Sequence, residues 1–392
     1  HDAGNAISVI NARHEQGTAY MAYGYAQSTG EIGVYAVVPG PGLLNTTAAL
    51  STAFSNNSRV LALTGQIPSG SIGRGHGMLH EIPHQLEVMK GLTKYAARIE
   101  HPSQAPSIVS EAFRQLRSGR PRPAGLEMAM DVMWKKAMVE LRGKTPGDAP
   151  PAPDPDAIEK AAKLIGNAKK PMIFVGGGAY DACEEVKALA EMLQAPVVAY
   201  QNGRGILDER HYLSHTATAG AILWRTCDVA IAIGSRLQGE RMTWGMDDNI
   251  KVVHIDIDPT EINRVMKPEI GIVADAAEAT GLLVNALSKH NIKRSSREEE
   301  MLGVKGQAAE IMETKAGPQM GWIRAMRDVL PEDGLFVDEF TQVGYVSRVG
   351  FPIYKPRYNV TPGYQGTLGF GYATALGVKV AHPNKSVLSI NG

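Results

Sequence analysis

The segment from residue 13 to residue 45 places a carboxylic acid and an amide around a glycine turn. Glu15 opens an Ala/Gly/Tyr-rich helical stretch. The turn Gly40-Pro41-Gly42 follows an apolar run, with Asn45 just beyond it. A carboxylic acid in a dry pocket can hold a proton, because burial disfavours its charged form. A glycine turn between a strand and a helix exposes backbone N–H groups. By themselves, these features are also typical of a solvated helix start and a structural turn.

His80-Glu81-Ile82-Pro83-His84 matches the spacing of a zinc-protease signature. That chemistry requires both histidines on one continuous helix. Pro83 removes a backbone donor and clashes with the preceding turn, and residues 70–77 upstream include four glycines. We therefore predict a loop at this position, and we assign no metal ligands in this chain.

Two further segments are weaker candidates for nucleotide binding. Gly177 lies in a run of three glycines between a predicted strand and a predicted helix. The run lacks the G-x-G-x-x-G spacing of dinucleotide sites. Asp256 ends a β-type run, where an aspartate can hydrogen-bond a ribose. An empty structural domain explains both segments as well.

The composition excludes several classes of protein. The 392 residues are enough for two or three domains, and 44% are hydrophobic, as in ordinary soluble globular chains. Lys+Arg and Asp+Glu number 40 each, so no basic surplus suggests nucleic acid or an anionic membrane. No apolar run is long enough to span a bilayer. Cys183 and Cys227 have no metal or redox spacing, which fits free thiols in a reducing compartment such as the cytoplasm.

Three α/β blocks are expected to position these residues. We place the first block at 1–142, a proline-rich linker at 143–156, the second block at 157–289, a polar connection at 290–320 and the third block at 321–392. Predicted strands are 34–38, 60–64, 171–175, 196–199, 229–234, 251–256, 334–338 and 387–390, and predicted helices are 16–28, 106–118, 157–167, 184–193 and 322–330. This alternation predicts parallel, doubly wound sheets.

The order of motifs resembles the thiamine-diphosphate enzymes, in the acetohydroxyacid (acetolactate) synthase branch. In the first block, RHEQ, GYA, the GPG turn, Asn45 and Gly65-Gln66 resemble that family's pyrimidine-binding domain. In the third block, Thr341-Gln342 and Gly366-Thr367-Leu368-Gly369 resemble the start of its diphosphate-binding domain. The resemblance covers essentially the whole chain. It implies three doubly wound α/β domains: pyrimidine-binding, central and partial diphosphate-binding.

The resemblance implies a role for each matched residue. Glu15 would contact the aminopyrimidine ring of the cofactor and activate it, and Leu368 would wedge under the cofactor's rings. The other residues implied at the cofactor are Gly40, Pro41, Gly42, Asn45, Gln66, Thr341, Gln342, Gly366 and Thr367. Both ends of the chain look cut, and the family's Mg²⁺ ligands are expected beyond Gly392.

Two departures from the family pattern leave details open. Leu79, His80 and Glu81 align with a Phe-Gln-Glu segment near the substrate channel, so the substrate is open and His80 could act in proton transfer. Residues 214–217 and 236–241 differ from the FAD-binding members. Whether FAD or an adenine nucleotide binds at Gly177 and Asp256 therefore stays open.

We predict thiamine-diphosphate-dependent decarboxylation of a 2-oxo acid with carboligation, similar to that of acetolactate synthases. The family resemblance implies a homodimer or homotetramer, and the balanced charge predicts no nucleic-acid or membrane partner. One alternative is another branch of the superfamily: an oxidase, a decarboxylase, or a C–C hydrolase or lyase. The other alternative is a non-catalytic nucleotide-binding or scaffold protein that kept the fold.

Overall fold

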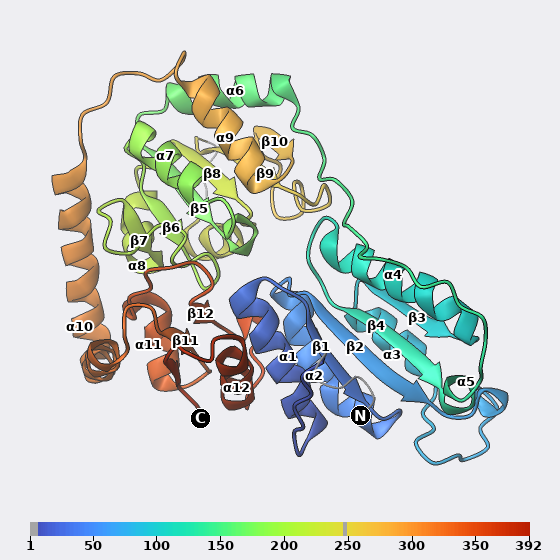
Figure 1. Cartoon of the computed structure of the whole chain (residues 1–392). Helices are drawn as coiled ribbons and strands as arrows, with labels where there is room; N and C mark the ends of the chain where they lie inside the picture. The colour runs from blue at the N-terminus through green and yellow to red at the C-terminus, as the bar shows by residue number, and fades with distance from the viewer. Residues whose placement is uncertain (1–6, 246–248) are drawn as a thin grey trace. The chain divides into compact units, whose positions relative to one another are not determined.

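The computed structural model describes residues 7–245 and 249–392, which form two compact units. The first unit comprises the chain up to Gly147 together with 364–383, and the second comprises 148–363 together with 384–392. In this described part of the chain, three sheets, all parallel, confirm the predicted fold class (Figure 1). Within the described residues, no helix is long and apolar enough to cross a membrane.

The sheet of the first unit has the strand order β1-β2-β4-β3. Its strands are β1 (Gly33–Val37), β2 (Val60–Gln66), β3 (Tyr95–Ile99) and β4 (Ala124–Ala129), and the helices of this part are α1 (Glu15–Thr29), α2 (Pro41–Ser55), α3 (Gln85–Leu92), α4 (Ala105–Arg117) and α5 (Met130–Met133). The two strands and two helices predicted for this block form within two residues of their predicted ends. Strand β4 inserts between β2 and β3, so residues distant in sequence meet at one end of the sheet.

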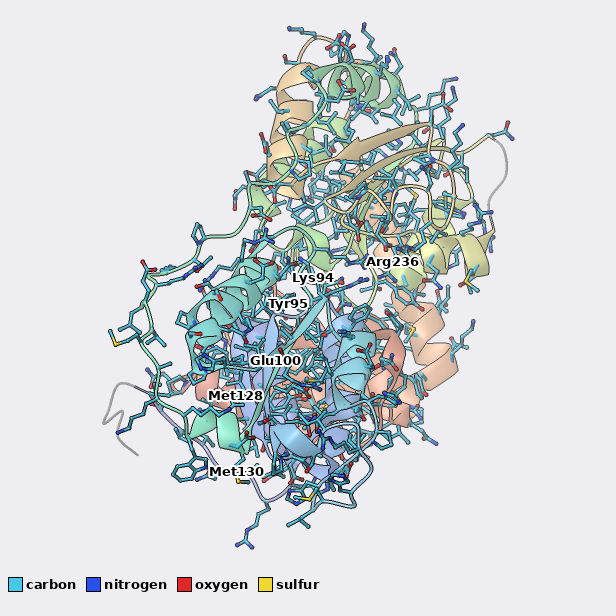
Figure 2. The ribbon with its side chains drawn as sticks, turned by 90° about the vertical axis from the view of Figure 1, so that its right-hand side faces the viewer. Lys94, Tyr95, Glu100, Met128, Met130 and Arg236 are labelled. Carbon is cyan, nitrogen blue, oxygen red and sulfur yellow. The ribbon has the colours of Figure 1, made fainter. Side chains whose placement is uncertain are left out.

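Strand β3 forms one edge of this sheet, and Figure 2 labels Lys94, Tyr95 and Glu100 along it. The Nζ atom of Lys94 donates to the backbone oxygens of Gln115 (2.9 Å) and Ser118 (2.6 Å). A cation at the carboxyl end of a helix satisfies carbonyls that have no partner in the helix. Lys94 therefore ties the end of α4 to the edge strand.

Helix α12 (Gly371–Ala381) lies in the first unit, although it belongs to the third block in sequence. It packs against α1 through glycines. A Cβ atom at Gly24 would lie 2.2 Å from the carbonyl oxygen of Thr374, and one at Gly377 would lie 2.0 Å from that of Met21. Only glycine allows backbones to approach this closely.

The second unit contains a six-stranded sheet with the order β10-β9-β8-β5-β6-β7. Its strands are β5 (Pro171–Val175), β6 (Val197–Ala199), β7 (Ser214–Thr216), β8 (Val229–Ile233), β9 (Lys251–Asp256) and β10 (Ile270–Val273), with helices α6 (Pro155–Gly166), α7 (Cys183–Leu193), α8 (Ala217–Trp224) and α9 (Ala276–Leu287). The strand order reverses between β5 and β8. In such sheets, ligands commonly bind at this switch point.

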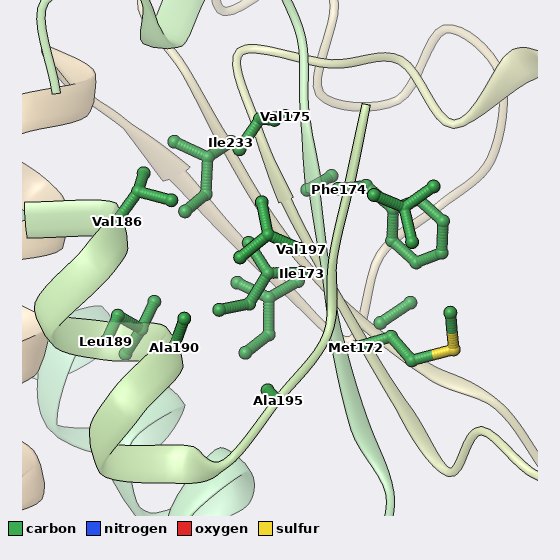
Figure 3. Packing of buried hydrophobic residues seen from close by; sticks show 14 of the residues in the cluster. Met172, Ile173, Phe174, Val175, Val186, Leu189, Ala190, Ala195, Val197 and Ile233 are labelled. Carbon is green, nitrogen blue, oxygen red and sulfur yellow. The ribbon is translucent and has the colours of Figure 1, made fainter. Parts of the chain in front are cut away.

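The core of this sheet is apolar on both faces. Strands β5 and β8 are buried along their whole length, as expected for central strands of a parallel sheet. Figure 3 shows Val186, Leu189 and Ala190 of α7 directed at the sheet. Their spacing of three and four residues places them on one face of the helix.

Residues 136–154 form no helix or strand, whereas Pro155, predicted in the linker, is the first residue of α6 and follows its N-cap Asp154. The later connection differs from the expectation. Helix α10 (Glu298–Val329) covers most of residues 290–320, with non-helical φ/ψ at Ala316, two residues before Pro318. Met301, Val304 and Ala308 are buried at helical spacing, a narrow apolar stripe within a polar sequence.

The remaining sheet has the order β12-β11-β13. It consists of β11 (Leu335–Val337), β12 (Asn359–Val360) and β13 (Val387–Ser389), and helix α11 (Gln342–Gly350) follows β11. The predicted strands at 334–338 and 387–390 form here.

Candidate active site

Glu15 is the first residue of α1, and a second side chain holds its carboxylate. The Nδ2 atom of Asn45 donates to Oε2 of Glu15 at 3.1 Å. The preceding residue, His14, caps the helix, with Nδ1 accepting from the backbone N–H of Gln16 at 3.1 Å. The backbone N–H of Glu15 and then the Asn45 amide hold the pKa of this carboxyl below its usual value. The acid and the amide named from the sequence are thus in direct contact.

The environment of Glu15 differs from the expected dry pocket. Glu15 is half-buried, its hydrogen bond with Asn45 is exposed, and its pKa is lowered rather than raised. The cause is the helix start, where free N–H groups favour a negative charge. In this unit Glu15 is therefore a carboxylate at neutral pH, and a group that covers it would raise its pKa.

The Gly40 turn fits only glycine at its first position. Gly40 has φ +60°, and a Cβ atom there would lie 2.2 Å from the carbonyl oxygen of His80. Pro41 begins α2, where its missing N–H costs no hydrogen bond. At Gly42, a Cβ atom would lie 2.6 Å from Cγ2 of Val38. The turn therefore packs closely against both the preceding strand end and the His80 loop.

The His80 loop has the backbone that the sequence analysis predicted. His80 and His84 have φ of +69° and +55°, and α3 begins only at Gln85, so the two histidines do not share a helix. The carboxylate of Glu81 accepts from the backbone N–H groups of Gly75 (3.1 Å) and Met78 (2.8 Å). Glu81 therefore stabilises its own loop.

Leu79 is the most exposed of the three predicted substrate-channel residues, with 84% of its surface accessible. His80 is partly exposed, and its carbonyl oxygen abuts Gly40. The structure therefore brings this segment beside the glycine turn.

A buried polar network lies beneath the turn, and the sequence analysis missed most of it. Gln85 donates from Nε2 to the Gly65 carbonyl (2.9 Å) and to Oε2 of Glu127 (2.8 Å). Arg98 donates from Nε to Oε1 of Glu127 at 2.5 Å. Gln66, predicted at the cofactor, is buried and donates to Glu127 at 3.4 Å. In this unit the amide of Gln66 is directed into the network.

The Gly366–Gly369 turn also lies in the first unit. Gly366 and Gly369 have φ of +63° and +72°. The hydroxyl oxygen of Thr367 lies 3.0 Å from that of Thr52, a residue of α2. The turn is thus tethered to the helix that carries Asn45. Leu368 leaves 68% of its surface exposed, which fits the predicted contact with a ring.

Thr341 and Gln342 lie in the second unit, whereas Glu15, Asn45 and Leu368 lie in the first. Thr341 caps α11, with Oγ1 accepting from the backbone N–H of Gly344 at 2.9 Å. Gln342 is the exposed first residue of that helix. The start of a helix offers N–H groups to an anion, so these positions suit a diphosphate.

At the switch point of the central sheet, the loops that follow β5 and β8 pack against each other. A Cβ atom at Gly176, after β5, would lie 2.2 Å from the carbonyl oxygen of Gly234, after β8. At Gly177, a Cβ atom would lie 3.3 Å from the ring of Tyr180. The Asp256 carboxylate accepts from the backbone N–H of Asp258 at 2.9 Å. The glycine run therefore serves the packing of two loops, and Asp256 supports its own turn.

Comparison with known proteins identifies the family. Models of the thiamine pyrophosphate enzymes match residues 2–88 (N-terminal TPP binding domain), 158–283 (central domain) and 341–392 (C-terminal TPP binding domain). A probable acetolactate synthase large subunit of Methanocaldococcus jannaschii is 33% identical over 409 residues, covering 98% of this chain and 68% of that protein. The chain belongs to the thiamine pyrophosphate enzyme family.

Within the thiamine pyrophosphate enzymes, the relatives support the acetolactate synthase-like branch. The acetolactate synthase of Arthrospira platensis is 32% identical over 413 residues, covering 97% of this chain and 69% of that protein. A probable 2-ketoarginine decarboxylase of Pseudomonas aeruginosa is 28% identical over 409 residues, covering 99% of this chain and 71% of that protein. The chain is therefore a thiamine pyrophosphate-dependent enzyme rather than a scaffold, and its relatives differ in their named reactions.

Proposed function

We propose that this enzyme decarboxylates a 2-oxo acid and transfers the remaining fragment to a second carbonyl compound. The observation that carries the proposal is the Glu15 carboxylate held by Asn45 at 3.1 Å. The acetolactate synthases among the relatives support the transfer step. Bound thiamine diphosphate supplies the electron sink that decarboxylation requires.

The residues of the first unit would bind and orient the aminopyrimidine ring. Asn45 and the start of α1 fix the direction of the Glu15 carboxylate. A ring lying over Glu15 would remove water from it, and this burial would raise the pKa of Glu15 until it could share a proton with a ring nitrogen. The exposed Leu368 side chain offers an apolar surface to the rings, and Thr341 and Gln342 would bind the diphosphate.

A hard cation such as Mg²⁺ suits a diphosphate bound by oxygen ligands. We propose a homodimer or homotetramer in the cytoplasm, as the family resemblance implies.

The decisive variant is Glu15→Gln in the full-length protein. The amide cannot exchange a proton with the ring, so turnover of 2-oxo acids should fall by about 100-fold or more with the fold intact. The matched control is Glu31→Gln, an exposed residue just after the same helix. Unchanged turnover in Glu15→Gln would contradict the mechanism.

The second candidate function is decarboxylation without transfer. The 2-ketoarginine decarboxylase among the relatives and the presentation of Leu79 and His80 beside the Gly40 turn favour it. A panel of 2-oxo acids, with acetohydroxyacid and aldehyde products measured separately, distinguishes the two. Aldehyde as the sole product would replace the first proposal by the second.

A further inference from the structure

One buried side chain fixes the glycine turn from below. The Oε1 atom of Gln85 accepts a hydrogen bond of 2.7 Å from the backbone N–H of Gly40, 45 residues earlier in the chain. The same amide donates to the Gly65 carbonyl at the end of β2 and to Glu127 on β4. Gln85 thus joins the turn to two neighbouring strands, β2 and β4.

Only glutamine satisfies all three partners. A side-chain amide has one acceptor oxygen and two N–H donors, and here the oxygen meets an N–H while both donors meet oxygens. Flipping the amide would place its oxygen against two acceptors. A glutamate would lose both donors and add a second carboxylate beside Glu127, which is 1% exposed. Gln85 itself is 1% exposed, so water cannot replace its bonds.

The Gly40 turn is joined through α2 to Asn45, the residue that hydrogen-bonds Glu15. Gly40 is the N-cap of α2, and Asn45 lies on the first turns of this helix. The carbonyl oxygen of His80 packs closely against the Cα atom of Gly40 and leaves no space for a side chain there. A helix moves as a rigid element, so a displaced Gly40 would shift Asn45 away from the Glu15 carboxylate.

We propose that Gln85 is a positioning residue for cofactor activation. It holds the Gly40 turn and thereby sets the hydrogen bond between Asn45 and Glu15, without contact of its own with substrate or cofactor. This inference rests on the proposed function of Glu15. It predicts that loss of the Gln85 amide slows activation of the bound cofactor more than it weakens binding.

The test uses the full-length holoenzyme and the variant Gln85→Met. Solvent exchange of the C2 hydrogen of bound thiamine diphosphate, followed by NMR, measures activation directly. We expect exchange and kcat to fall about 10- to 100-fold, because small displacements of catalytic groups have effects of this size. The KM values for cofactor and substrate should change by less than about threefold, because no residue that contacts them is replaced.

The matched control is Gln27→Met. Gln27 is also a buried glutamine of the first unit, and it accepts a hydrogen bond of 2.6 Å from Ser58, but it does not contact the Gly40 turn. It should lose comparable thermal stability and keep its exchange rate. If Gln85→Met does not fold, Gln85→Asn and Gln27→Asn give the same comparison, because asparagine is too short to span the three partners.

A double-mutant cycle with Asn45→Ala tests the route of the effect. If Gln85 acts through Asn45, Gln85→Met should lower exchange several-fold less in the Asn45→Ala background than in the wild type. Equal effects in both backgrounds, or exchange equal to that of Gln27→Met, would overturn the positioning role alone. Absence of C2 exchange in the wild-type enzyme would instead overturn the proposed function, and the inference with it.

Discussion

Two glycine-rich strand ends of this enzyme differ in what they leave open. At the Gly40 turn, glycine lets the His80 loop approach closely, while the Glu15–Asn45 pair remains open to solvent. At the central switch point, Gly176 and Gly234 close on each other and Asp256 bonds to its own turn. A glycine run therefore marks a place where two backbone segments approach each other closely. A binding site also needs, beside the glycine run, a polar side chain that can still form a hydrogen bond with a ligand.

The strongest test of this difference compares Gly40→Ala with Gly234→Ala. Both positions have positive φ and no space for a Cβ atom, so each variant should lose about 1–3 kcal/mol of stability. Gly40→Ala should also lose about 100-fold in kcat, because it displaces the turn that carries Asn45. Gly234→Ala, assayed where it is folded, should keep kcat within about threefold, because Gly234 belongs to the second unit and Glu15 to the first. Equal loss of kcat in both variants would remove the distinction.

Low pH should destabilise the central sheet through His215, a buried residue of β7. Burial, with Lys305 and Arg297 nearby, lowers the pKa of His215 to about 3. The unfolded chain, with a pKa near 6.5, therefore takes up the proton first as the pH falls. Stability of the second unit should decline below pH 6.5 by up to about 1.4 kcal/mol per pH unit.

Denaturant unfolding of the wild type and His215→Leu across this pH range measures the effect. In the leucine variant, the free energy of unfolding should no longer show the part of its pH dependence that comes from His215. An identical slope in both proteins would assign the acid sensitivity to other groups.

The smallest effect is expected for Asp256→Asn. This side chain accepts a hydrogen bond within its own turn, and asparagine can accept the same bond. Turnover and cofactor affinity should both change by less than about twofold. A larger loss of activity, measured with and without added FAD, would show that the switch point is functional after all.

The sequence was sufficient where the site is local. Glu15 opens a helix and Asn45 follows a strand-to-helix turn, and both signals lie within a few residues of the group they place. Gln85, Glu127 and Arg98 carry no such signal. They meet only because β4 lies between β2 and β3, an order that no local pattern specifies. A buried glutamate on a short apolar strand was the one available hint.

Long-range packing also decided what the sequence analysis missed in the fold. The stretch 290–320 was expected as a connection because it is polar, yet its few buried apolar residues hold α10 against the central sheet's unit. Of the unpredicted strands, β3, β4 and β10 have four to six residues, whereas β7 and β12 are only three and two residues long. Such strands depend on their neighbours rather than on their own composition.

The contact between α1 and α12 limits which substitutions this enzyme tolerates at Gly24 and Gly377. Most helix pairs are separated by a layer of side chains, which can change rotamer when a residue changes. Here Gly24 and Gly377 bring backbone against backbone, so no such layer exists at the crossing. One helix starts at Glu15 and the other just after Leu368. The spacing between the acid and the apolar side chain is therefore held by the main chain, and a single added methyl group at either glycine would change it.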